Sequence, residues 1–517
     1  MWRFATSARS STRALKHLAA GGSAAASLAV AGCVTLKATQ TRENGPALCQ
    51  GDAPTPMSLD LNALTAVTAV DGRYESKTKA LRGYFSEYAL HRCRVEVMVN
   101  WVLHMSQNKE MPEVKELSAE ARAALLAIAT NFDVAAAASV KKIERTTNHD
   151  LKACEYHIKQ EMDKHPELKE LKEWVHFACT SEDVNNLAYA LMLSRARSDV
   201  LLPKMDELIA GLRTLQKQHA ARPLLSLTHG QTATPTTFGK EMANVAHRLQ
   251  HHRDTLAAVH IVGKFNGATG NFNAHKVAYP DMAWQQVSQE FVTKYLGVEY
   301  QPYSTQIECH DYIAEICNAV GRFNTTLLDL DRDMWQYTSR GILKLKTVAG
   351  EVGSSTMPHK VNPIDFENSE GNVGICNAML DHFAQKLPVC RMQRDLSDST
   401  VLRALGTAFA HGLIAYEATL KALTRITVNA EVMDAELEGS WEVLAEPAQT
   451  LLRKYQVAGA YELLKEATRG RSMDKDGMRS FFATLESKLP AHEVEKLRKL
   501  TPATYIGLAE ELAKADE

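Results

Sequence analysis

One stretch of this chain has the composition of a loop that could close over an anion. Residues 353–363 read Gly-Ser-Ser-Thr-Met-Pro-His-Lys-Val-Asn-Pro. Small residues keep the backbone free to move, while hydroxyl groups, backbone N–H groups and the Lys360 ammonium can face one negative charge. An ordinary Ser/Gly-rich connector has the same composition, and composition alone favours that interpretation.

A second polar segment offers a proton donor. Residues 228–235 read Thr-His-Gly-Gln-Thr-Ala-Thr-Pro, and His229 is the ionisable side chain among them. Because an imidazole changes protonation near neutral pH, His229 could act as a general acid. A histidine that is only hydrogen-bonded within a turn is the competing interpretation, which the segment in isolation favours.

Two shorter clusters lie between helical stretches. Residues 146–150 read Thr-Thr-Asn-His-Asp, and residues 179–183 read Cys-Thr-Ser-Glu-Asp. Both contain the residue types that begin helices, so each could be a helix cap and nothing more.

A fifth polar segment, residues 391–403, carries arginines around an expected helix start. Arg394 and Arg403 flank Ser399 in this segment. Guanidinium groups in such a place suit carboxylates and phosphates. A solvated, charged turn is the ordinary alternative.

Two other segments imitate binding motifs. Residues 263–271 are rich in glycine, but they lack the spacing G-x-x-x-x-G-K-[ST] and are expected to follow a helix rather than a strand, which argues against a nucleoside-triphosphate site. The pair His251-His252 lacks an acid–histidine pattern at i, i+4, so we expect no metal site.

The elements that must position these segments are helices. Apolar residues recur at intervals of three and four, and no stretch alternates with period two between turn signals. The pattern predicts an all-α fold with a long central helical bundle, which should associate into an oligomer. The clearest helices are expected at 201–219, 237–260 and 313–337.

Two further helices are expected from their first residues. Asn362 and Pro363 precede Asp365, an order typical of a capping residue, a first-turn proline and an acid near the positive helix end. This helix should run to about Lys386. Another should begin at Ser397 and continue for about 25 residues.

Four regions follow from this pattern. Residues 1–56 form an N-terminal extension, residues 57–170 an N-terminal helical domain, residues 171–427 the central bundle domain, and residues 428–517 a C-terminal helical domain.

Charge and cysteine content exclude several functions. The net charge of the 517 residues is -2, whereas a broad nucleic-acid surface needs an excess of Lys and Arg. The nine cysteines include no C-x-x-C pair, which indicates reduced thiols and no zinc site. We expect neither a nucleic-acid nor a membrane partner.

The first 56 residues have the composition of a targeting segment. They contain no acid before Glu43 and are rich in Ser and Ala, as in an organelle transit peptide. A dispensable cytosolic extension and a signal segment, with a lipoprotein-like site at 30–33, are the alternatives. Residues 18–36 are uncharged but too poor in large apolar side chains for a membrane span. The expected location is cytoplasmic or organellar.

Together, the segments resemble a known group of enzymes. Residues 353–363 match the signature G-S-S-x-M-P-x-K-x-N-P of the fumarase/aspartase superfamily. His359 before Lys360 resembles the adenylosuccinate lyase family, since fumarases and aspartases usually have Gly there and argininosuccinate lyases Gln. The clusters at 146–150, 180–183 and 228–231, together with the arginine-rich segment, resemble the bacterial type of that family, and the similarity runs from about Met57 to the C-terminus.

The resemblance implies a fold and an activity. It implies a three-domain all-α fold and a homotetramer in which three subunits contribute to each active site. The implied partners are small succinylated purine nucleotides, and no cofactor is implied. Fumarate would leave adenylosuccinate to give AMP, and succinylaminoimidazole carboxamide ribotide to give the carboxamide ribotide.

The resemblance also assigns roles in this β-elimination. His229 would be the general acid, Ser354 the general base, and His149 would bind the substrate or support the acid. A serine hydroxyl is a very weak acid, so Ser354 could serve only if Lys360 and backbone N–H groups favour its alkoxide in a dry site. Ser355 is the rival base.

The substrate carries two carboxylates and a phosphate, and the remaining family positions would bind it. They are Arg73, Tyr74, Asn148, Asp150, Thr180, Ser181, Gln306, Ser355, Val361, Asn362, Asn368, Arg394, Ser399, Thr400, Val401, Leu402 and Arg403.

Two other functions compete with this hypothesis. Another lyase of the superfamily, such as one that cleaves argininosuccinate, would share the signature, but His359 and residues 146–150 argue against it. A non-catalytic scaffold relative would be expected to have lost one of the acid, base or lysine positions. His229, Ser354 and Lys360 are all present.

Overall fold

The computed structural model describes residues 60–515, apart from 348–349, 351–355, 358 and 469–472. These residues belong to a unit that begins at Asp60. The predicted extension at 1–56 lies outside the described residues, as do Ser354 and Ser355, the two predicted base positions.

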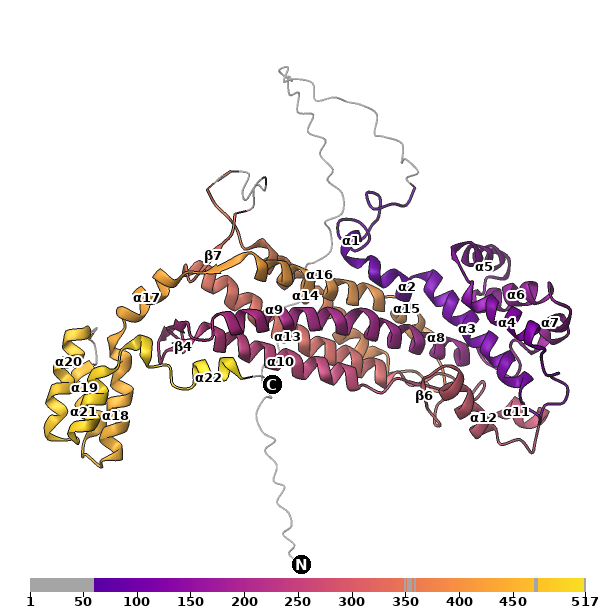
Figure 1. Ribbon diagram of the computed structural model, residues 1–517. Helices are drawn as coiled ribbons and strands as arrows, with labels where there is room; N and C mark the ends of the chain where they lie inside the picture. Colours follow the sequence, from indigo (N-terminus) through magenta and orange to yellow (C-terminus); the bar gives the residue numbers. More distant parts are fainter. Residues whose placement is uncertain (1–59, 348–349, 351–355, 358, 469–472, 516–517) are drawn as a thin grey trace, which may run out of the picture. The chain divides into compact units, whose positions relative to one another are not determined.

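Long helices lie side by side in the middle of this unit (Figure 1). α13 contacts both α10 and α14, while α16 contacts α14 and α9. The five helices are α9 (Leu202–Gln218), α10 (Phe238–Ala258), α13 (Asp311–Ser339), α14 (Ile364–Lys386) and α16 (Leu405–Thr424). Helices of this length, packed along one another, form the predicted central bundle.

The pattern of apolar residues explains why these helices associate. On α13, Ile316, Val320, Phe323 and Leu327 are all buried, and their spacing of three and four places them on one face of the helix. Burying that face against α10 and α14 removes apolar surface from water, which is the main driving force for packing.

The helices expected at 201–219, 237–260 and 313–337 are present as α9, α10 and α13, with ends that differ by at most two residues. The helix expected after Pro363 is also present and ends at Lys386, as predicted. Its N-cap is Pro363, not Asn362, and no side chain caps it.

The prediction of a single helix from Ser397 is wrong, because the chain forms two helices there. α15 (Ser397–Leu402) ends at Arg403, and α16 begins at Leu405. Near the break, the Phe85 ring packs so closely on Gly406 that a Cβ there would lie 2.5 Å from the Phe85 Cβ. The break leaves Arg403 as the C-cap of a short helix, where its side chain turns to another segment.

Further helices pack at the start of the bundle. α3 contacts α4, α6 and α8. They are α1 (Glu75–Thr78), α2 (Arg82–Phe85), α3 (Glu87–Ser106), α4 (Ala119–Thr130), α5 (Val134–Thr147), α6 (Asp150–Met162), α7 (Pro166–Leu171) and α8 (Ser181–Ala196). Two more, α11 (Asn273–Ala278) and α12 (Trp284–Glu290), lie near this group (Figure 1).

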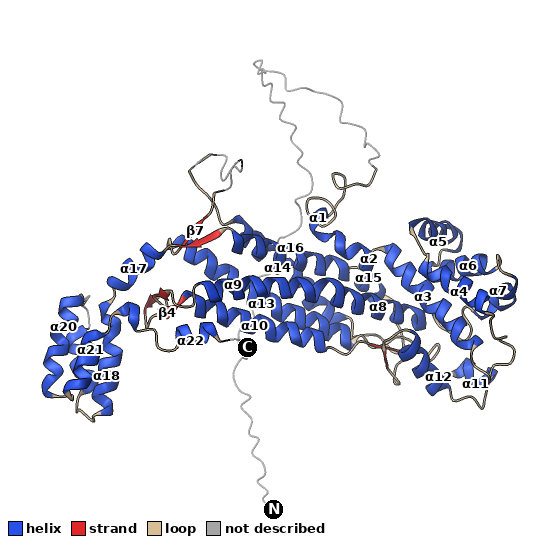
Figure 2. Ribbon diagram, in the orientation of Figure 1, coloured by secondary structure: helices blue, strands red, loops and turns tan. Residues whose placement is uncertain are grey.

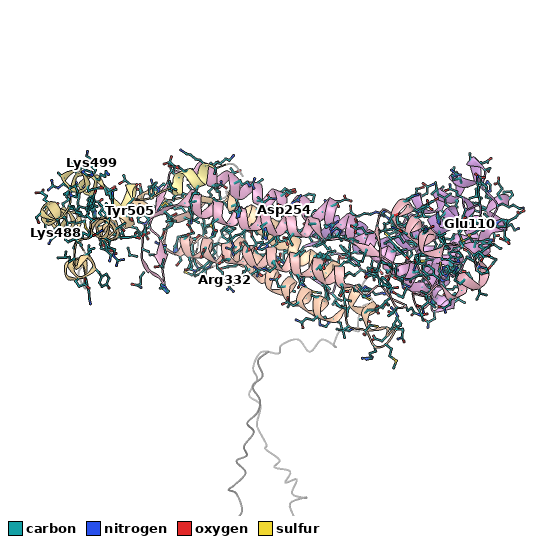
Figure 3. The ribbon with its side chains drawn as sticks, turned by 90° about the horizontal axis from the view of Figure 1, so that it is seen from below. Glu110, Asp254, Arg332, Lys488, Lys499 and Tyr505 are labelled. Atoms are coloured by element: carbon teal, nitrogen blue, oxygen red, sulfur yellow. The ribbon has the colours of Figure 1, made fainter. Side chains whose placement is uncertain are left out.

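The C-terminal helices have a hydrophobic cluster of their own. Leu444, Leu452, Phe482 and Leu497 pack together in it. The helices are α17 (Ala430–Glu438), α18 (Ala445–Lys454), α19 (Ala460–Thr468), α20 (Lys475–Thr484), α21 (Ala491–Lys499) and α22 (Ala509–Lys514), the last of which returns to α9 and α10. Figure 3 shows Lys488, Lys499 and Tyr505 at this end of the bundle and Glu110 at the other.

The strands among the described residues are only two or three residues long and form four pairs (Figure 2). The pairs are β1 (Pro223–Leu224) with β4 (Thr236–Thr237), β2 (Leu227–Thr228) with β3 (Gln231–Thr232), β5 (Val262–Gly263) with β6 (Glu299–Tyr300), and β7 (Leu343–Leu345) with β8 (Ile426–Val428). They connect helices without forming a layer, and the predicted all-α class is confirmed.

No single helix in the described part of the chain has the length and apolar composition needed to cross a membrane. The pair α4 and α5, bent by 82°, meets that test when the two helices are taken together.

Candidate active site

The junction between α5 and α6 presents His149. Asn148 ends α5 in the left-handed region (φ 49°), and its N–H donates to the Glu144 carbonyl (2.7 Å). His149 then caps α6, because its Nδ1 accepts a hydrogen bond from the Lys152 N–H (3.1 Å). The ring is fixed by one nitrogen, and half of the side chain (51%) is exposed.

The next residue, Asp150, is held between two arginines. Its Oδ2 lies 2.9 Å from Arg94 Nη1 on α3 and 2.8 Å from Arg403 Nη2. Burial alone would raise the pKa of Asp150, but the two guanidinium groups outweigh burial and hold that pKa well below its usual range. The carboxylate is therefore ionised and fixes the side chain of Arg403.

The start of α8 is fixed by a fully buried ion pair. Asp183 Oδ1 lies 2.8 Å from Lys264 Nζ, and neither side chain is exposed. The same carboxylate accepts hydrogen bonds from the backbone N–H groups of Thr180 (2.8 Å), Asn266 (3.0 Å) and Gly267 (3.1 Å). These contacts hold Thr180 and Ser181, two predicted binding residues, at the N-terminus of α8.

This contact also gives a role to the glycine-rich segment 263–271. The segment begins within strand β5 (Val262–Gly263) and does not directly follow a helix, so the expectation on that point is wrong. Its backbone N–H groups face Asp183 of the protein itself. The segment therefore braces α8.

Arg394 lies between carboxylates from two segments. Its Nη1 is 3.1 Å from Asp398 Oδ2, and its Nη2 is 3.1 Å from Glu182 Oε1. At the other end of α15, Arg403 Nη1 donates to Ser399 Oγ (3.1 Å). The predicted positions 394, 399 and 403 are thus adjacent, with Thr400 exposed beside them, Val401 half-buried and Leu402 in the core.

Further contacts join these groups into one cluster. Arg94 Nε donates to Asn185 Oδ1 (2.9 Å), and Asn185 Nδ2 donates to Glu182 Oε1 (2.7 Å). The Gln306 N–H donates to the Gln393 carbonyl (3.3 Å), which places Gln306 beside Arg394. Four predicted segments far apart in the chain, 148–150, 180–181, 306 and 394–403, therefore meet.

We call the ionisable members of this cluster the charged network. His310 belongs to it because its ring lies 3.3 Å from Asp398 and 3.6 Å from Glu308. The full set is Arg94, Asp150, Glu182, Glu308, His310, Arg394, Asp398 and Arg403. Five of them, Arg94, Glu182, Glu308, His310 and Asp398, were not among the predicted site residues. The sequence holds weak signals for them: an arginine in the apolar stretch of α3, and acids beside a histidine just before a long helix.

Tyr74 and Asn368 form a second group, where the Asn368 amide donates to Tyr74 Oη (2.9 Å). Arg73 precedes Tyr74 and is exposed. Lys360 and Val361 are exposed just before α14, and the Lys360 N–H donates to the Met357 carbonyl (3.0 Å). Asn362 is half-buried.

His229 forms the tip of a hairpin. It lies between β2 and β3 with φ 54°, followed by Gly230 with φ 71°. Positive φ at both central residues is the geometry of a two-residue hairpin turn, and a histidine adopts it less readily than glycine. The ring is exposed. Thr234 Oγ1 donates to Glu446 Oε2 (2.7 Å), which ties the segment to the C-terminal helices.

The hairpin lies far from the charged network in one chain. Helical backbone runs from Ser181 through α8, a π-helical turn and α9 to Gln218, which corresponds to roughly 57 Å at 1.5 Å per residue. The network lies at the first end of this path, and β4, which follows the hairpin, lies at the other (Figure 1). His229 and His149 therefore do not meet within one copy of the chain.

One group among the described residues has the geometry of a metal site. Ligand atoms of Glu87, His91 and Glu144 lie within 4.8 Å of one another. The Lys141 ammonium already contacts both carboxylates, at 2.6 Å from Glu144 and 3.5 Å from Glu87. The lysine supplies the positive charge that a metal would bring.

Two family models match the chain. A model described as lyase matches residues 72–379, and one described as adenylosuccinate lyase C-terminal matches residues 390–506. Together, they span the network, the hairpin and the C-terminal helices.

Curated relatives are similar over almost their whole length. The adenylosuccinate lyase of Vibrio cholerae serotype O1 is 54% identical over 454 residues, which cover 88% of this chain and 99% of that protein. The adenylosuccinate lyase of Escherichia coli strain K12 is 54% identical over 451 residues, covering 87% and 98%. That of Legionella pneumophila strain Corby is 49% identical over 457 residues, covering 88% and 100%.

Solved structures share the fold at low sequence identity. A 3-carboxy-cis,cis-muconate lactonizing enzyme from Pseudomonas putida superposes with a TM-score of 0.65 at 22% identity, covering 85% of this chain and 97% of its own. A fumarate lyase from Mesorhizobium sp. BNC1 gives 0.66 at 17% identity, covering 84% and 96%.

Proposed function

The chain belongs to the adenylosuccinate lyase family, and from that membership we propose that it releases fumarate from adenylosuccinate, leaving AMP. The same site would release fumarate from succinylaminoimidazole carboxamide ribotide, so that the protein would serve purine biosynthesis at two steps. The observation that carries the proposal is the match at 54% identity over nearly the full length of curated adenylosuccinate lyases.

The charged network supports this proposal on physical grounds. A substrate with two carboxylates and a phosphate needs fixed donors. Carboxylates hold Arg394 and Arg403 in place, and Arg403 in turn donates to the Ser399 hydroxyl. Donors that are already oriented need little rearrangement as charge develops in the transition state. The arginines would bind substrate oxygens with their remaining N–H groups.

The chemistry is a β-elimination. A base removes a proton from the carbon next to a carboxylate, and a dianion forms that nearby cations and donors must stabilise. An acid then protonates the departing nitrogen. We assign the base to Ser354, the acid to His229 and stabilisation of the dianion to Lys360. His149, fixed through Nδ1, would bind the substrate or support the acid.

We further propose that several copies build each site. His229 lies at one end of the long helices and the charged network at the other, so antiparallel neighbours would bring them together. A homotetramer with three chains at each site satisfies this requirement, with Lys360 and Asn362 from one chain, the network from another and His229 from a third.

The proposed activity has a direct test. The protein is mixed separately with adenylosuccinate, with succinylaminoimidazole carboxamide ribotide and with argininosuccinate, and fumarate is measured. We expect release from the first two. Release from argininosuccinate alone would overturn the proposal. The comparisons do not favour argininosuccinate cleavage or a non-catalytic scaffold, because the curated relatives reported above are named adenylosuccinate lyases.

A further inference from the structure

His310 occupies a buried position between two carboxylates. The residue is only 2% exposed. Its Nδ1 lies 3.6 Å from Glu308 Oε2, and its Nε2 lies 3.3 Å from Asp398 Oδ2. Its backbone N–H also donates to Glu308 (2.8 Å). The histidine thus links the segment before α13 to the start of α15.

Asp398 is shared between His310 and a residue of the proposed site. The oxygen that faces the His310 ring, Oδ2, also accepts from Arg394 Nη1 (3.1 Å). Its other oxygen accepts from the Ser399 N–H (2.7 Å). Whatever changes the charge next to Asp398 therefore acts directly on Arg394 and on the turn that presents Ser399.

The signs of charge alternate along the network, in which the Asn185 amide joins Glu182 to Arg94. Glu308, Asp398, Glu182 and Asp150 carry negative charge, and His310, Arg394, Arg94 and Arg403 can balance them one for one. The ionic contacts between these neighbours range from 2.8 to 3.6 Å. The balance is complete only when the imidazole is protonated.

The surroundings favour the protonated ring. Burial alone would lower the pKa of His310, but hydrogen bonds and charge from Asp398 and Glu308 raise it to about 9. With a neutral ring, Glu308 and Asp398 would lie close together in a buried place with no cation between them. A net negative charge there would oppose an anionic ligand and strengthen the hold of Asp398 on Arg394.

We propose that His310 is a positioning residue whose positive charge balances Glu308 and Asp398, so that Arg394 and Ser399 stay available to the anionic groups of the substrate. The proposal rests on the function proposed above. His310 is buried behind Asp398 and does not need to touch the substrate; it acts through Asp398. Its loss should therefore weaken substrate binding more than it slows the chemical step.

The test uses a loss of charge and its compensation. His310→Gln keeps a polar side chain but leaves the network with one uncompensated carboxylate. Glu308→Gln combined with His310→Gln removes one charge of each sign and restores the balance. A role in packing alone predicts that the double variant is worse than the single one, whereas charge balance predicts that it is better.

Steady-state kinetics with adenylosuccinate distinguish these outcomes. We expect H310Q to raise KM about tenfold or more while kcat changes by less than about threefold, and E308Q/H310Q to return KM to within about threefold of the unmodified enzyme. An unchanged KM in H310Q would overturn the proposal, as would a raised KM that E308Q does not restore. If H310Q does not fold, the KM of the double variant decides.

Thermal unfolding of the full-length variants gives a readout that needs no turnover. Because an uncompensated buried charge is destabilising, E308Q/H310Q should melt at a higher temperature than H310Q. Failure of the unmodified protein to release fumarate would reject the proposed function. The charge balance would then be judged from the melting temperatures of E308Q/H310Q and H310Q alone. A double variant that melts below H310Q would reject the charge balance.

Discussion

Arginine side chains in the proposed site are held from behind by carboxylates. Arg403 contacts Asp150 of α6, and Arg394 contacts Glu182 of α8. In each case the partner comes from a segment more than two hundred positions away in the chain. The guanidinium groups are thus oriented before any ligand arrives, which limits the entropy lost on binding.

At the residue scale, the acid and base assignments predict the largest losses. His229→Ala or Ser354→Ala should lower kcat about a hundredfold or more, because each removes a group that transfers a proton. His229 is exposed at a hairpin tip, so its replacement should leave folding and assembly unchanged. Turnover and size-exclusion profiles check both statements.

A matched control for this prediction is His492→Ala. His492 is also exposed (64%), but it lies on α21 beside Glu493. Its replacement should leave kcat unchanged. Near-normal turnover in both the H229A and S354A variants would refute the assignment.

Individual site residues were predictable when they belonged to a recognisable segment. His149, Ser181, Arg394 and Arg403 were named from such segments. Arg94 was not, since one arginine among apolar residues in α3 carries no signal of its partner Asp150. The pairing depends on how α3 and α6 pack, which residue types and spacing along the chain do not show.

At the scale of elements, the start of α8 depends on the buried Asp183–Lys264 pair. Lys264→Met should lower the free energy of unfolding by about 3–5 kcal/mol, because it leaves a fully buried carboxylate without its counter-charge. Urea unfolding measures this change. As a control, Lys294→Met removes a lysine that pairs with Glu290 on the surface (2.5 Å) and should leave the free energy of unfolding almost unchanged. Equal losses in the two variants would contradict the role given to Asp183.

The centre of the bundle contains an acid whose ionisation should depend on packing. Asp331 on α13 accepts a hydrogen bond from Thr419 Oγ1 (2.8 Å), and burial raises its pKa to about 7. Since that pKa is above the unfolded value, the stabilisation from protonation is complete below about pH 4 and is lost as the pH rises through about 7.

Asp331→Asn removes this dependence. At pH 8, the neutral amide should raise the free energy of unfolding by on the order of 2–4 kcal/mol, and the melting temperature with it. At pH 5, both increases should be much smaller. Melting curves at the two pH values make the comparison. A variant that is equally destabilised at both would show that Asp331 is ionised and needed.

The helices differ in how well the spacing of apolar residues in the sequence predicts where they begin and end. α9, α10 and α13 were predictable because long apolar faces leave little choice. The break between α15 and α16 was not, since the sequence from Ser397 to Leu420 keeps helical periodicity throughout. The chain is interrupted near the point where Phe85 of α2 packs on Gly406 and Arg403 reaches Asp150. Both contacts come from distant segments.

At the scale of the whole molecule, residues 1–56 should be dispensable. The curated relatives match 87–88% of this chain and 98–99% of their own length. We expect a shortened protein beginning at Met57 to fold and to release fumarate at the rate of the full chain. Insolubility of the shortened protein, with the full chain soluble, would contradict this. The comparisons do not support the transit-peptide hypothesis.

The central claim is that one active site combines His229 from one copy with the charged network of another. Mixing two inactive variants, His229→Ala and Arg394→Met, under conditions that exchange subunits tests it most directly. If the acid and the network come from different copies, about a quarter of the sites in mixed oligomers join two intact contributions, and fumarate release should reappear. No recovery, with mixed oligomers verified by native mass spectrometry, would show that His229 and the network act within one chain or not at all.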